Sequence, residues 1–112
     1  MREIKFRAWD AEEKNFICFD ALDGILSKCD ETYRKRCVCK FEQFTGLYDK
    51  NGKEIYEGDI PDGYGAVFFS NEYLGYFAKS NEFECEYKPI YDIPIIEIIG
   101  NIHENPELLN DL

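Results

Sequence analysis

The chain has 112 residues with a formal net charge of −10, and it is 45% hydrophobic and 16% aromatic. This length predicts one domain, residues 1–112, that is large enough to bury a core without metal or disulfide staples. The longest nearly apolar run, Ile93–Ile99, is interrupted by Glu97 and is too short for a transmembrane helix, so we expect no membrane span.

The N-terminus and the cysteines indicate the compartment. Met1 leads directly into the polar residues 2–5, without the apolar stretch of a signal peptide, so we expect a cytoplasmic protein. An odd number of cysteines in such a chain predicts reduced thiols and no disulfide framework. The five cysteines are Cys18, Cys29, Cys37, Cys39 and Cys85.

The charges are distributed unevenly. Residues 1–53 carry 11 basic and 10 acidic side chains, whereas residues 54–112 carry 2 basic and 13 acidic side chains. The acidic half would repel nucleic acids and acidic membranes. The basic cluster of Arg34, Lys35, Arg36 and Lys40 is interpreted as a solvated helix end or loop. Alternatively, the cluster contacts an acidic partner or the acidic half of a second copy.

The first half of the chain predicts one hairpin and one further strand. Residues 2–9 alternate between apolar and charged side chains, and after a polar turn at 10–15 a second strand is expected at 16–19. The spacing of apolar residues between 21 and 26 suits a short helix that Gly24 weakens, and 30–33 is expected to form a loop. A strand is predicted over 37–44.

The clearest local signal is a tight hairpin at Asp49–Lys53. Asn51-Gly52 lies there between two short apolar stretches, and both residues tolerate positive φ. Two further turns are predicted at 57–59 and at 61–63.

The second half continues with short strands. A hairpin is predicted from 65–69 and 73–78, an alternating strand from 83–87, and a β-branched strand from 95–99. Asn105 followed by Pro106 and Glu107 predicts a capped C-terminal helix. The whole pattern predicts an α+β, mostly β fold, in which antiparallel hairpins form a small barrel-like, SH3-like sheet with a short C-terminal helix.

Three segments together resemble the YopX family, whose members are small proteins encoded by phages and prophages, mainly of Gram-positive bacteria. The segments are residues 2–10, 44–60 and 99–109. The resemblance implies a phage origin, a location in the cytoplasm of the bacterial host cell and a mostly β fold. It carries over no established activity and no catalytic residues. The sequence departs from the family pattern after Ile60, where Pro61-Asp62-Gly63 replaces a continuing strand. Residues 57–69 also resemble part of an SH3-like barrel, by analogy only.

Few residues suggest chemistry. His103, beside Glu104, is the sole histidine and could act as a general base or a metal ligand, but a lone histidine is more often structural. Glu57 and Asp59 flank Gly58 and could bind a divalent cation, although a turn stabilised by Asp59 is the favoured interpretation. Cys37 and Cys39, with Cys29 upstream, lack the spacing of a zinc site. We therefore expect no catalytic, cofactor-binding or metal-binding residues, and no cofactor.

The favoured hypothesis is a non-enzymatic phage or prophage accessory protein that acts through protein–protein contacts and self-associates, with a phage or host protein as a further partner. It interprets the aromatic residues of 68–77 as core and subunit interface. One alternative is a nucleic-acid-binding module, or a protein whose acidic half mimics DNA. A remote alternative is a metal-dependent hydrolase using Glu57, Asp59 and His103. The cations of the nucleic-acid alternative are Arg2, Lys5, Arg7, Arg34, Lys35, Arg36 and Lys40.

Overall fold

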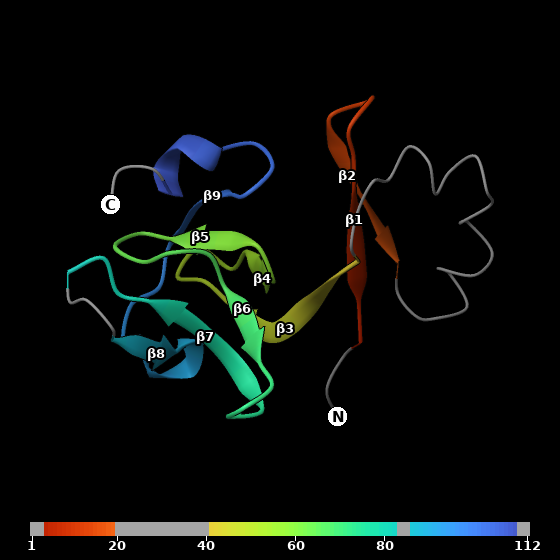
Figure 1. Ribbon diagram of the computed structural model, residues 1–112. Coiled ribbons are helices and arrows are strands. Elements are labelled where there is room, and N and C mark those ends of the chain that lie inside the picture. Colours follow the sequence, from red (N-terminus) through yellow and green to blue (C-terminus); the bar gives the residue numbers. More distant parts are fainter. Residues whose placement is uncertain (1–3, 20–40, 83–85, 110–112) are drawn as a thin grey trace.

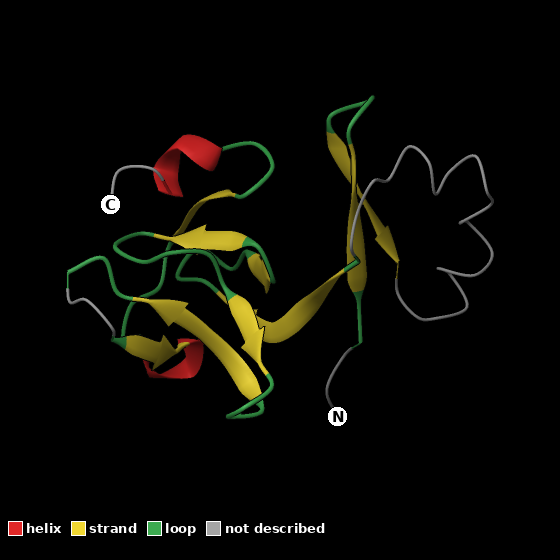
Figure 2. Ribbon diagram, in the orientation of Figure 1, coloured by secondary structure: helices red, strands yellow, loops and turns green. Residues whose placement is uncertain are grey.

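The computed structural model describes residues 4–19, 41–82 and 86–109. These residues form short β-strands and two turns of 3-10 helix (Figures 1 and 2). In chain order the elements are β1 (Phe6–Asp10), β2 (Asn15–Phe19), β3 (Glu42–Tyr48), β4 (Glu54–Tyr56), β5 (Asp59–Pro61), β6 (Phe68–Ser70), β7 (Gly75–Lys79), β8 (Tyr87–Pro89), η1 (Ile90–Asp92), β9 (Ile98–Asn101) and η2 (Pro106–Leu109).

The strands pair in three antiparallel groups, with the orders β2-β1-β3-β4, β5-β9 and β6-β7-β8. The β1–β2 hairpin stands to one side, and the long β3 leads from it to the body that β4 to β9 form (Figure 1). The prediction of a mostly β fold, with antiparallel hairpins in a barrel-like sheet, is confirmed, and the observed strands curl into a half-barrel. No described helix has the length and apolar character that crossing a membrane requires.

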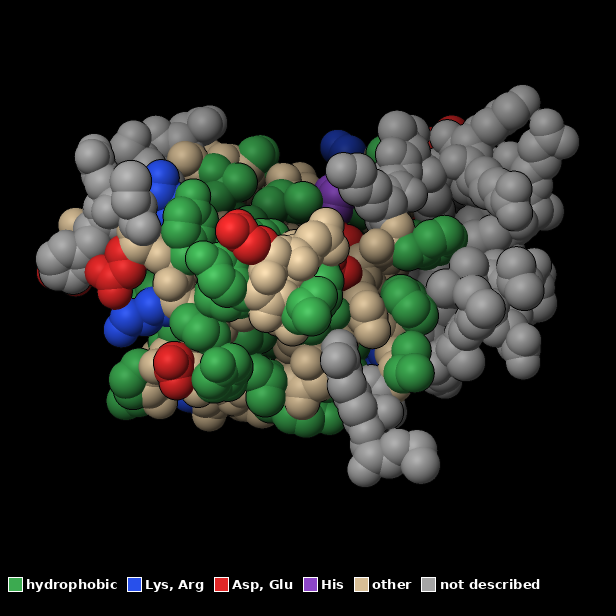
Figure 3. Space-filling model, turned by 60° about the horizontal axis from the view of Figure 1, so that its bottom comes forward, with side chains coloured by type: hydrophobic (Ala, Val, Ile, Leu, Met, Phe, Trp, Pro, Cys, Tyr) green, Lys and Arg blue, Asp and Glu red, His purple; other side chains and the backbone are tan. Residues whose placement is uncertain are grey.

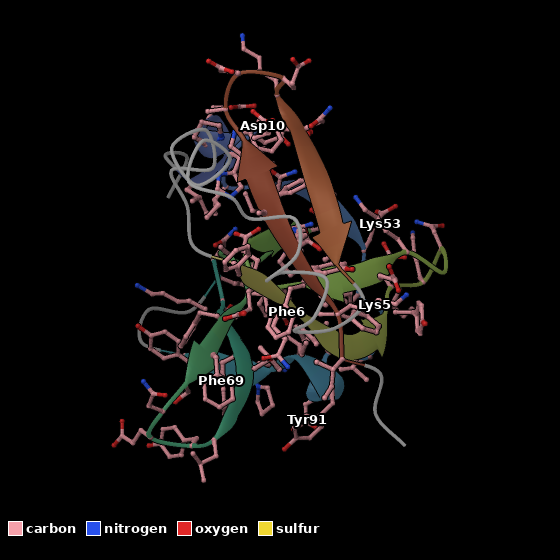
Figure 4. All side chains as sticks on the ribbon, turned by 90° about the vertical axis from the view of Figure 1, so that its right-hand side faces the viewer. Lys5, Phe6, Asp10, Lys53, Phe69 and Tyr91 are labelled. Atoms are coloured by element: carbon pink, nitrogen blue, oxygen red, sulfur yellow. The ribbon has the colours of Figure 1, made fainter. Side chains whose placement is uncertain are left out.

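The first hairpin forms as predicted, but its first strand begins at Phe6, so Ile4 and Lys5 of the strand expected at 2–9 lie outside it. β1 and β2 pair along their whole length, from Phe6 opposite Phe19 to Asp10 opposite Asn15. Lys14 adopts a φ of +56° in the connecting turn, and the Asp10 carboxylate accepts backbone N–H bonds from the turn at 3.0 and 3.2 Å. Figure 4 shows Asp10 near the tip of this hairpin and Phe6 at its base, beside β3.

The Asp49–Lys53 hairpin is confirmed, but its turn has a different geometry from the one that Asn-Gly predicts. Only Gly52, and not Asn51, adopts a positive φ, of +82°. The Gly52 N–H donates to the Asp49 carbonyl at 3.0 Å, so the turn spans Asp49 to Gly52 and the glycine is its last residue. The Asp49 carboxylate then accepts N–H bonds from Asn51 and Lys53, each at 2.9 Å.

Asp49 also joins this turn to the far end of the chain, because its second carboxylate oxygen accepts the Ile98 N–H at 3.1 Å. Burial alone would raise the pKa of Asp49, but the N–H bonds from Ile98, Lys53 and Asn51 outweigh burial and lower this pKa below its usual value. The turn is therefore anchored by an ionised, buried side chain as well as by its glycine.

A small apolar core lies within the body. Ala78 of β7 and Ile55 of β4 are fully buried, and the isoleucines of η1 and β9 pack with them. Its buried members are Ile55, Val67, Ala78, Ile90, Ile93 and Ile98. The core thus unites β4, β7, η1 and β9, which are distant in sequence.

Several predicted boundaries move. The strand expected at 95–99 is β9, which begins at Ile98, and β5 ends at Pro61 after a register shift. The C-terminal helix is one 3-10 turn, and the Asn105 side chain bonds backwards to the Asn101 N–H at 3.3 Å instead of capping that turn. The predicted features at 20–40, at 83–85 and at four of the five cysteines lie outside the described residues.

Candidate functional site

A buried ionic cluster forms where β1, β3 and β5 meet. Arg7 of β1 donates to Glu42 Oε1 at 2.9 Å and to Asp59 Oδ1 at 2.8 Å. It also donates to the Glu57 carbonyl at 3.1 Å, and its guanidinium lies over the rings of Phe16 and Tyr56. The three charged side chains are at most 9% exposed.

His103 extends this cluster towards the surface. Its Nε2 lies 3.2 Å from Glu42 Oε2, and its ring stacks on Trp9 with an interplanar angle of 8°. With 20% of its side chain exposed, His103 is the most accessible of the four charged or titratable members. An open hollow of about 410 Å³ borders it, lined also by Trp9, Ala11, Lys14 and Glu104.

The residues of the hydrolase hypothesis are therefore only partly brought together. Asp59 and His103 lie on opposite sides of the pair formed by Arg7 and Glu42. Glu57 turns away, because its Oε1 accepts the Gln43 N–H at 2.7 Å. Sequence reasoning missed both Arg7 as a buried cation and Glu42, since nothing local in β1 or β3 distinguishes them from exposed charges.

The geometry gives the cluster a stabilising role. The second oxygen of Asp59 accepts the Tyr56 N–H at 2.9 Å, which is the turn interpretation predicted for this residue. Burial raises the pKa of the Asp59 carboxyl, and the charge of Arg7 opposes that shift. Within the described residues no group of three or more His, Cys, Asp and Glu side chains is arranged to hold a metal ion. Asp59 is 1% exposed, so its carboxylate is closed to a substrate.

The described cations of the nucleic-acid hypothesis are also engaged within the chain. Arg7 is in the buried cluster, and Lys5 forms an ion pair with Glu54 of β4. In Figure 4, Lys5 lies near the base of the β1–β2 hairpin, beside β3. The five remaining cations of that hypothesis lie outside the described residues.

The β6-β7-β8 sheet has an aromatic outer face. In β7, Ala78 and Tyr76 point to the core, so Phe77 and Lys79 point to the opposite side. The register places Phe77 between Phe68 of β6 and Pro89 of β8, and places Lys79 opposite Tyr87. One side of this sheet is therefore apolar and faces solvent.

Four aromatic rings, which we call the outer aromatic face, form a continuous array on that side. They are Phe68, Tyr73, Phe77 and Tyr87. Phe68 lies 6.4 Å from Phe77 and 5.9 Å from Tyr87, and Tyr73 lies 5.8 Å from Phe77, between ring centroids. Tyr73 is 71% exposed and Tyr87 is 52% exposed. With Ser70 and Glu72, the four rings line an open hollow of about 550 Å³.

The aromatic residues of 68–77, expected to form core and interface together, do not all lie on one side of the sheet. The structure separates them by strand alternation: Tyr76 packs on the core, while Phe68, Tyr73 and Phe77 lie on the outer side. Tyr87 was missed as a member of this face. The alternation of β7 was readable in the sequence, but the pairing of β8 beside it was not.

A second apolar hollow, of about 300 Å³, lies beside the Asp49 turn. Its exposed members include Tyr91 at 73% and Ile95 at 75%. Figure 3 shows hydrophobic side chains gathered on the side of the molecule that carries the β6–β7 hairpin, β8 and η1, with few charged side chains among them. Figure 4 places Phe69 on the β6–β7 hairpin and Tyr91 at η1.

Comparison with known proteins supports the family resemblance. The model of the YopX protein family matches residues 5–110, nearly the whole chain. No curated protein matches the chain at a significant level. Because the match spans β1 to η2 and includes every strand described above, the chain belongs to the YopX protein family.

Proposed function

We propose that this protein is a non-enzymatic accessory protein of a phage or prophage, which acts in the bacterial host cell through protein–protein contacts and self-associates. The phage setting follows from the family resemblance. The contact function rests on one observation, the outer aromatic face of the β6-β7-β8 sheet.

Such a face has an energetic cost when it stays in water. Aromatic side chains provide most of the binding energy of many protein interfaces, because each buries a large area at a small loss of rotamer freedom. Here four rings already pack on one another and need no rearrangement before binding. A preformed aromatic array on a paired sheet is therefore well suited to an interface.

The face is also independent of the residues that hold the fold. Ala78 and Tyr76 supply the β7 side chains that pack in the core, whereas the outer rings lie on the other side of the same strand. The buried ionic cluster lies at β1, β3 and β5, which are other strands. Contacts on the outer face can thus form without disturbing either source of stability.

Sedimentation velocity over the micromolar to submillimolar range tests this proposal. We expect a concentration-dependent shift to larger species for the wild-type protein, and a clear weakening in Tyr73→Ser. Tyr91→Ser is the matched control, because Tyr91 is equally exposed (73% against 71%) but lies outside the outer aromatic face.

The outcomes show whether the protein self-associates and which of the two apolar hollows forms the contact. A wild-type protein that stays monomeric throughout would contradict self-association. If Tyr91→Ser, and not Tyr73→Ser, weakens association, then the second hollow and not the outer aromatic face is the contact. Thermal unfolding of both variants checks that they remain folded.

A further inference from the structure

We infer that the occupant of the outer aromatic face is a second copy of this chain, stacked face to face with its β7 strand antiparallel to the first. This inference rests on the proposed function and adds the geometry of the contact. The evidence for it is the position of two charged residues, Glu72 and Lys79, beside the four rings.

Opposite charges lie at the two ends of the array. Glu72 lies in the turn before β7 and lines the hollow with the rings. Lys79 is the last residue of β7 and points to the same side, since it is two residues from Phe77 and pairs with Tyr87. Both residues are exposed, and neither forms an ion pair with another residue of the described part.

A twofold axis makes this face complementary to itself. When the axis lies in the plane between two stacked sheets and runs perpendicular to β7, each strand faces its own equivalent in the opposite direction. Phe77 lies between Glu72 and Lys79 in the sequence, so the axis crosses the aromatic array between its two charged ends. Each Glu72 lies towards the partner's Lys79, and this pair occurs twice.

The other face-to-face arrangement is disfavoured. A twofold axis parallel to β7 would place Glu72 over the equivalent glutamate and Lys79 over the equivalent lysine. Like charges facing each other across an interface discriminate against that orientation. Both arrangements keep the strand directions of the stacked sheets within about 30° of alignment, so the charges are what distinguish them.

The second apolar hollow lacks this complementarity. Its two charged members are already engaged, because Asp49 accepts three backbone N–H bonds and Lys50 Nζ lies 3.6 Å from Glu97 Oε2. It therefore offers no free pair of opposite charges to orient a second copy. The outer aromatic face does, which is why we assign the second copy to it.

Charge reversal tests the orientation. Glu72→Lys and Lys79→Glu, studied separately at low ionic strength, should each weaken self-association by about tenfold, because each places like charges together at both ends. An equimolar mixture of these two variants should associate at close to wild-type strength, since the mixed dimer has opposite charges at both ends. The double variant Glu72→Lys/Lys79→Glu should also recover wild-type strength.

The readout distinguishes this inference from the function on which it rests. If the wild-type protein dimerises and Tyr73→Ser weakens the dimer, but the charge-reversed variants associate like the wild type, the antiparallel stacking is wrong and the contact function stands. If each single variant associates like the wild type but their equimolar mixture associates more tightly, the parallel arrangement is correct, because only the mixed parallel dimer then has opposite charges at both ends. A monomeric wild-type protein overturns both. Lys88→Glu is the control from the other side of the sheet, since Lys88 pairs with Ala78. Lys88 is half-buried, so thermal unfolding first checks that this variant is folded, and a folded Lys88→Glu should associate like the wild type.

Discussion

Replacing Arg7 with methionine is expected to cost about 3–5 kcal/mol of unfolding free energy at pH 7. Arg7 is 5% exposed and holds two carboxylates at 2.9 and 2.8 Å. Methionine fills much of the space but leaves Glu42 and Asp59 buried without their cation. The expected loss is a large part of the roughly 5–15 kcal/mol that stabilises a small domain, so the variant should still fold.

The pH dependence of this loss is the sharper test. Without Arg7, the pKa of Asp59, which burial already raises, should rise further. The native variant then binds protons at a higher pH than its unfolded chain does, so its free energy of unfolding increases as the pH falls. The gap in unfolding free energy between the wild type and the variant should therefore narrow as the pH falls from 7 towards the unfolded pKa near 4, by at most about 1.4 kcal/mol per pH unit for each proton.

Urea titrations at several pH values measure this gap. The matched control is Lys50→Met, which removes a cation that lies 3.6 Å from Glu97 with both side chains more than a third exposed. An exposed pair is worth less than about 1 kcal/mol, so this control should change stability little at any pH. A loss in the Arg7 variant below about 1 kcal/mol, or one that is constant with pH, would refute the assignment of Arg7 as the cation that compensates both buried carboxylates.

Three further changes probe the turns by urea titration. Gly52→Val should cost about 1–2 kcal/mol, because Gly52 has a φ of +82° in open space and a β-branched residue is strained there; unchanged stability would contradict this. Gly58→Ala should cost more unfolding free energy than Gly63→Ala. The two φ values are similar, +87° and +85°, but only at Gly58 would an added Cβ overlap the Glu42 carboxylate. Equal losses of stability would show that the Glu42 side chain is displaced freely. Asp49→Asn should cost about 1–3 kcal/mol at pH 7. Because the pKa of Asp49 is lowered in the folded protein, ionised Asp49 stabilises the fold above the unfolded pKa near 4, and this stability is lost as the pH falls through the folded pKa. The cost of Asp49→Asn should therefore shrink in acid. A cost that is constant with pH would contradict the assignment of Asp49 as a buried, ionised side chain.

Local features of the fold were predictable from the sequence because each has a local cause. The hairpin of residues 6–19 follows from alternation, and the turn at Asp49 follows from Asn51-Gly52 between apolar stretches. The geometry of the Asp49–Gly52 turn was not predictable from these local residues, because it depends on a distant part of the chain. Asp49 satisfies the turn with its side chain, and the third N–H that it accepts comes from Ile98, 49 residues away.

The buried cluster was not predictable for a related reason. Arg7 alternates with apolar residues as an exposed strand cation does, and its partners are 35 and 52 residues distant. A single sequence shows neither separation as a contact. The candidate site was missed in part on the same grounds, since a single sequence does not show that β8 pairs beside β7.

The alternation of β7 makes the proposed contact separable from folding. Tyr76 and Ala78 pack on the core, and Phe77 and Lys79 carry the outer side, so neighbouring residues serve different purposes. Substitution of an outer residue removes little native packing, whereas it removes contact area or charge that only a second molecule can use. A loss of association without a loss of stability is consequently the specific signature of this face. A variant that lost both together would place the residue in the fold and not in the interface.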